Sequence, residues 1–129
     1  LPLRSIADRA IPLAFGSDFP VVNPDPLLNL HAAIRRCGFG DMPRDEFNPA
    51  EALSPRQALR ACTHGWAYAA DVEGTRGAIK AGQAADFTVV AGVDNDLRDW
   101  SAAKVVMTVC GGVVVFNNSS FQRRQFVRE

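Results

Sequence analysis

Acidic, histidine and cysteine side chains are the groups in this sequence that could act in catalysis or bind a metal. Asp18 stands out among them, because it follows a short apolar run, residues 10–15, through Gly16 and Ser17. A carboxylate can bind a metal ion or accept a proton from an attacking water. By residue type alone, an aspartate ahead of a proline-rich loop is more often a turn former or a helix cap.

The histidines and the other aspartates give weaker signals. His31 and His64 both fall on predicted helices beyond the apolar run, where a histidine is more often structural than a metal ligand. Four further aspartates are interpreted as solvated charges or helix caps, namely Asp8, Asp25, Asp41 and Asp45.

The cysteines predict neither disulfides nor a zinc site. Cys37, Cys62 and Cys110 are odd in number, widely spaced and without a C-x-x-C pair. Each has apolar or helical neighbours, so an inert buried thiol is expected at all three positions. A reducing compartment, the cytoplasm, fits this usage best.

The charge balance argues against a polyanion or a membrane as partner. Fourteen basic residues match fourteen acidic ones. The terminal arginines Arg123, Arg124 and Arg128 are interpreted as a solvated tail, because no aromatic platform accompanies them. The longest apolar stretch, 105–116, is interrupted by glycines and too short to span a bilayer.

The first half of the chain predicts a helix ending near residues 5–9, a buried strand over 10–15 and a rigid loop with three prolines. A helix then begins near Asp25 or Pro26, and Gly38 supplies its C-terminal stop. Residues 38–51 lack a clear period, which indicates a surface excursion.

The second half begins with a helix and then turns to β-structure. Ser54 and Pro55 are typical of a helix start, and the apolar spacing continues that helix to about Ala70. Three β-rich segments follow, at residues 86–90, 104–110 and 113–116. Paired glycines between the last two segments predict a hairpin.

Six motifs in this order resemble the amidohydrolase superfamily, and within it the amidohydrolase-3 branch of metal-dependent amide hydrolases. Each motif is weak alone, but their order and spacing together are specific, and they cover almost the whole chain up to Phe116. The matching segments are residues 3–6, 15–21, 24–27, 53–63, 77–90 and 109–115.

The resemblance implies an α/β fold, with the last strand and helices of a metal-dependent (β/α)8 TIM barrel and the C-terminal part of a small β-sandwich. It assigns residues 1–73 to the barrel, 74–117 to the sandwich and 118–129 to a polar tail. Asp18 then matches the carboxylate that binds the metal and takes a proton from water, at the strand ends where barrel active sites lie. Asp86 matches a structural position that opens a sandwich strand.

The implied activity is hydrolysis of a carbon–nitrogen bond, other than a peptide bond, in a small-molecule substrate. One or two divalent metal ions, zinc by expectation, would assist it. The family's H-x-H motif and its later strand-end histidines do not occur in this sequence. Because catalytic zinc takes about three protein ligands, this chain is expected to be an inactive C-terminal fragment.

Two other interpretations stay open. The chain could be a non-catalytic structural or interaction module, or a truncated remnant, and in either case association would cover exposed barrel edges. A small independent α/β binding protein is a third alternative.

Overall fold

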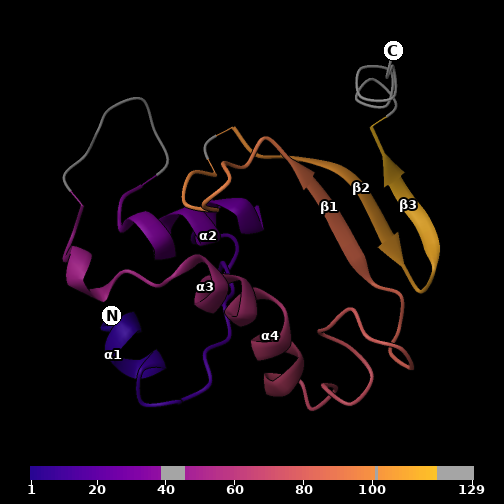
Figure 1. The fold of residues 1–129 in the computed structure, drawn as a ribbon, viewed down its shortest axis with the longest axis horizontal. Coiled ribbons are helices and arrows are strands. Elements are labelled where there is room, and N and C mark those ends of the chain that lie inside the picture. The colour runs from indigo at the N-terminus through magenta and orange to yellow at the C-terminus, as the bar shows by residue number, and fades with distance from the viewer. Residues whose placement is uncertain (39–45, 101, 119–129) are drawn as a thin grey trace.

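Helices gather on one side of the molecule and a small antiparallel sheet extends from the other (Figure 1). The computed structural model describes residues 1–38, 46–100 and 102–118. The expectations for Asp41, Asp45 and the terminal arginines lie outside these residues. The helices are α1 (Leu3–Ala7), α2 (Pro26–Arg35), the 3-10 helix η1 (Pro49–Glu51), α3 (Pro55–Cys62) and α4 (His64–Ala69).

Helix α2 begins where the sequence predicts and ends earlier than expected. The Asp25 side chain accepts the backbone N–H of Leu27 at 2.9 Å, which makes it the N-cap, and Pro26 takes the first helical position. The left-handed residue at the other end is Arg36, with φ 53°, rather than Gly38. Arg36 donates from Nε to the carbonyl of Phe47 at 3.2 Å, and this contact holds the turn.

Helix α3 confirms the predicted start, because Ser54 and Gln57 form a reciprocal capping box. The prediction of one helix up to Ala70 is wrong, since the helix breaks at Thr63, where φ is −115° and ψ is −86°. The Thr63 hydroxyl donates to the carbonyl of Leu59 at 2.8 Å. Such bonding of a threonine to the preceding turn bends helices, and α4 therefore leaves in a new direction.

The strand predicted over residues 10–15 does not form in the described part of the chain, where residues 11–17 have no strand assignment. Its Phe15 N–H instead donates to the carbonyl of Ala61 in α3 at 3.3 Å. A strand exists only with a neighbouring strand to share its hydrogen bonds. No second strand lies beside this segment among the described residues, so an apolar run alone was an insufficient signal.

The sheet confirms the predicted β-rich half. It consists of β1 (Phe87–Ala91), β2 (Lys104–Cys110) and β3 (Val113–Asn117), paired antiparallel in the order β1-β2-β3. Gly111 and Gly112 connect the last two strands with φ 56° and 81°. Two consecutive positive φ angles are what the type I′ two-residue hairpin turn requires, and glycine adopts them without steric cost.

The core lies between the helices and the adjoining end of the sheet. Leu30 and Ile34 of α2 pack with Ala58 of α3 and with Trp100, and Val90 of β1 packs against this cluster. Strand β3 has no such cover, because all five of its residues are exposed. In Figure 1 it forms the edge of the sheet farthest from the helices.

This mixture of helices and a small antiparallel sheet agrees with the α/β class expected from the sequence. The barrel, the sandwich and the division at residue 73 stay predictions. None of the helices in the described ranges combines the length and apolar character that crossing a bilayer demands.

Candidate functional site

Asp18 lies at the turn where the segment after α1 enters the proline-rich loop. Its backbone is left-handed, with φ 51°, and its carbonyl accepts the N–H of Val21 at 2.9 Å across a cis Phe19–Pro20 bond. A positive φ is uncommon for a residue with a side chain, although aspartate tolerates it better than most. The residue is exposed, so its carboxylate is open to solvent.

The segment before Asp18 is held against the helices by close backbone packing. A Cβ atom placed on Gly65 of α4 would lie 1.9 Å from the carbonyl oxygen of Leu13, so only glycine permits this approach. Together with the bond from Phe15 to Ala61, the contact fixes residues 13–15 on α3 and α4. Two helices therefore position the backbone that leads to Asp18.

No metal-binding group assembles around Asp18 within the described residues. They contain no cluster of three or more histidine, cysteine, aspartate or glutamate side chains that could hold a metal ion. The part of the chain that the structure describes also gives the Asp18 carboxylate no hydrogen bond or ion pair.

His31 lies on α2 and contacts Cys37, whose sulfur is 3.5 Å from its Nε2. Burial lowers the pKa of His31 below its ordinary value, the charge of Asp99 opposes this, and that of Arg35 adds to it. The net shift favours the neutral imidazole. The sequence alone did not reveal this pair, because a spacing of six residues across a helix end is not a known motif.

His64 begins α4 and lines a cavity of about 380 Å³ between α1, residues 10–13 and the α3–α4 pair. Gln57, Arg60 and Tyr68 contribute the other polar side chains, and most of the lining is apolar. Asp18 does not line this cavity. The expectation that the two histidines are structural stays a prediction.

The remaining cysteines differ from one another. Burial raises the pKa of the Cys62 thiol to about 11, which is the inert state expected from the sequence. Cys110 is exposed at the end of β2, so the expectation that it is buried is wrong. It precedes the hairpin turn, where the chain has no covering element among the described residues.

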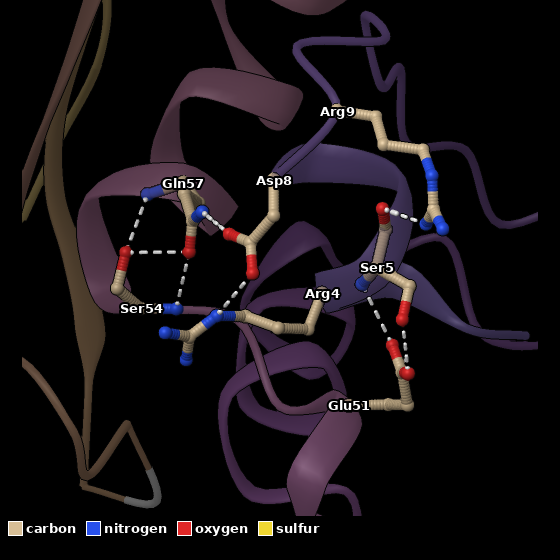
Figure 2. A network of polar contacts seen from close by, with 7 residues as sticks. All are labelled: Arg4, Ser5, Asp8, Arg9, Glu51, Ser54 and Gln57. Carbon is tan, nitrogen blue, oxygen red and sulfur yellow. Dashed lines mark hydrogen bonds and ion pairs between the residues drawn. The ribbon is translucent and has the colours of Figure 1, made fainter.

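A polar network joins α1 to the start of α3 (Figure 2). The Glu51 carboxylate accepts the backbone N–H of Ser5 at 2.9 Å and also its hydroxyl. On the other side Asp8 pairs with Arg4 at 3.2 Å and accepts from Gln57, the residue of the α3 capping box. The network is structural, since it ties together the elements that flank the segment leading to Asp18.

The geometry of these residues does not by itself identify a protein family, but comparison with known proteins does. The model of a family described as "Amidohydrolase family" matches residues 1–116. The chain is 30% identical over 118 residues to "Putative amidohydrolase YtcJ" of Bacillus subtilis (strain 168). That alignment includes 90% of this chain and 22% of the relative, so the chain spans less than a quarter of its length.

No solved structure matches the chain significantly. The family match, however, extends over all the described helices and over the sheet almost to the end of β3, and includes Asp18 and its flanking segments. The chain belongs to the amidohydrolase family.

Proposed function

We propose that this chain is the C-terminal portion of a metal-dependent hydrolase that cleaves a carbon–nitrogen bond, other than a peptide bond, in a small substrate. Asp18 is its contribution to the active site: the carboxylate accepts a proton from the attacking water and serves as one metal ligand. Membership of the amidohydrolase family is the observation that carries the proposal.

The setting of Asp18 supports this role. Its side chain is exposed on a turn whose approach is fixed by the packing of Leu13 on Gly65, so the carboxylate is presented at a defined place. A general base must reach the proton it accepts without first breaking other bonds. Within the described residues, no hydrogen bond or ion pair competes for this carboxylate.

The described residues do not by themselves fit a divalent metal, zinc or another. They provide no cluster of three potential ligands, whereas catalytic zinc takes about three protein ligands and a water. The other ligands of the proposed enzyme would come from residues outside the described ones. We therefore propose that the isolated chain is inactive.

The role of Asp18 is tested by Asp18→Asn in the complete protein that carries this chain, assayed on a panel of small amides. Asparagine keeps the size of the side chain but cannot accept the proton, so kcat should fall by roughly 10²- to 10⁴-fold. Asp25→Asn is the matched control. Asparagine is an equally good N-cap for α2, so activity should stay within about twofold of the wild type.

Metal content and turnover test the proposal that the isolated chain is inactive. The complete protein should hold stoichiometric metal, and the 129-residue chain should hold none and show no turnover. Activity with bound metal in the 129-residue chain would contradict its proposed inactivity. Full activity of Asp18→Asn would contradict the role of that residue.

A non-catalytic interaction module is the second candidate, and the exposed apolar strand β3 favours it. This alternative gains support if the complete protein hydrolyses no amide on the panel while Asp18→Asn melts at the wild-type temperature. Both candidate functions predict association through the uncovered sheet, so association does not distinguish them.

A further inference from the structure

The three free cysteines lie in three different environments. Cys62 is packed beside the helical core, and Cys110 is exposed beside the hairpin turn. Cys37 is partly exposed and has its sulfur 3.5 Å from Nε2 of His31. Among the described residues, Cys37 is the cysteine whose sulfur contacts a basic side chain, so Cys62 and Cys110 serve as internal comparisons for it.

Local backbone geometry brings Cys37 to His31. Arg36 takes a left-handed conformation directly after α2, which turns the chain back on the last turns of the helix. Cys37 follows this turn, so its side chain reaches a histidine six positions earlier. The negative end of the helix dipole disfavours a thiolate here, and a base is therefore needed to remove the thiol proton.

His31 is in the right protonation state to be that base. Partial burial holds its pKa below the ordinary value, which favours the neutral ring that can accept a proton. Two charged groups act on it from the elements around it: Arg35 on α2, which favours the neutral ring, and Asp99, which favours the charged ring. Asp99 would stabilise the imidazolium that forms when the thiol proton is transferred.

We propose that Cys37 is a modification site, at which His31 takes the thiol proton and the sulfur then reacts with small electrophiles and hydroperoxides. With a hydroperoxide, the sulfur attacks one peroxide oxygen and the O–O bond breaks. The leaving oxygen takes the proton from His31, which gives a sulfenic acid and water or an alcohol. The cysteine is oxidised and the hydroperoxide is reduced, with no other reactant.

The first experiment measures the alkylation rate of each cysteine with iodoacetamide in the native protein at pH 7. After quenching, the protein is unfolded, the remaining thiols are blocked with an isotopically distinct reagent, and peptides are quantified by mass spectrometry. An unassisted thiol is only a few per cent thiolate at this pH, so Cys37 should react roughly tenfold faster than Cys110. Cys62 should be slowest.

Substitution of His31 shows whether fast reaction at Cys37 is caused by proton transfer to the imidazole or only by solvent exposure of the thiol. In His31→Gln the rate at Cys37 should fall to that of Cys110, whereas the matched variant His64→Gln, on α4, should leave it unchanged. Circular dichroism establishes that each variant folds. A Cys37 rate no higher than that of Cys110, or one unaltered by His31→Gln, overturns the proposal.

A pH series on the unaltered protein provides a test that needs no variant. The alkylation rate at Cys110 should fall steadily as the pH is lowered, because an unassisted thiol reacts only as its thiolate. The rate at Cys37 should hold a plateau until His31 itself gains a proton from solvent. Treatment with hydrogen peroxide and dimedone should tag Cys37 first, and parallel pH slopes for the two cysteines would refute the role of His31.

Discussion

The carboxylate of Asp86, just before β1, accepts the backbone N–H of Gly111 in the hairpin turn at 2.6 Å. The same side chain forms an ion pair with Arg76, and the N–H of Gly112 donates to the carbonyl of Ala85 at 3.0 Å. The β2–β3 turn is thus tied to the start of the first strand. This contact explains in physical terms the structural role expected for Asp86.

Asp86→Ala should lower the free energy of unfolding by about 1–2 kcal/mol, because it removes a hydrogen bond to a charged acceptor. Asp86→Asn should lose less, since its amide oxygen can still accept from Gly111 while the exposed ion pair contributes little. Urea denaturation gives both values. Asp96→Ala is the control, because Asp96 is exposed and its side chain has no hydrogen bond or ion pair within the described part of the chain. Its stability should stay within about 0.5 kcal/mol of the wild type.

Gly65→Ala should destabilise the fold although alanine favours helices. The helix propensity of alanine contributes about 1 kcal/mol in its favour. Against this, the added methyl group would lie 1.9 Å from the carbonyl oxygen of Leu13, a backbone atom that cannot rotate away. We expect a net loss of roughly 1–3 kcal/mol in urea denaturation.

Gly74→Ala is the matched control for this substitution. A Cβ at Gly74 would meet nothing within 4 Å, and its φ is not positive. The variant should be neutral or more stable by up to about 1 kcal/mol, because alanine restricts the unfolded chain. Equal effects of the two substitutions would show that the contact between α4 and Leu13 does not constrain the fold.

Features set by neighbouring residues could be predicted from the sequence. The N-caps of α2 and α3 and the Gly111–Gly112 hairpin depend on local side-chain bonds and on local backbone freedom. The class of fold and the family also follow, because the six motifs are read in order along the chain.

Features that depend on distant partners could not be predicted. The run 10–15 has the composition of a buried strand, but its backbone partner in the described chain is a helix. The break at Thr63 involves a local bond to Leu59, but the apolar spacing continues across it and hides the break. For the candidate site, the flanking motifs predict Asp18, and that role stays a prediction. The pairing of His31 with Cys37 could not be predicted, because it depends on the left-handed turn at Arg36.

The contact between Glu51 and Ser5 should make stability depend on pH. The Ser5 hydroxyl and then the Ser5 N–H hold the pKa of Glu51 below its ordinary value of 4.5. A carboxyl whose pKa is lower in the folded state stabilises the fold above its unfolded pKa. That stabilisation is lost as the pH falls through the folded pKa.

Comparison of the wild type with Glu51→Gln isolates this effect. The difference in urea midpoint should be constant above about pH 5 and should shrink as the pH falls below 4.5. Ser5→Ala should reproduce the pattern in part, because the backbone N–H of Ser5 still donates to Glu51. A difference that does not change with pH would mean that Glu51 acts through packing and not through its charge.

The exposed strand β3 should make the isolated chain associate. Val113, Val115 and Phe116 are 65%, 61% and 48% exposed, and they lie together on a strand at the edge of the sheet. An apolar edge strand offers both unpaired backbone groups and side chains to a second chain. Val115→Lys should therefore weaken association in sedimentation velocity over a range of concentrations.

Ile79→Lys distinguishes disruption of the β3 edge from a general effect of added charge on association. Ile79 is 88% exposed but lies outside the sheet, so its substitution adds the same charge without altering the edge. If β3 is the contact, Val115→Lys shifts the protein towards monomer and Ile79→Lys does not. Equal shifts would assign the effect to net charge, and a wild-type chain that stays monomeric with a sharp cooperative melt would show that the uncovered strand needs no partner.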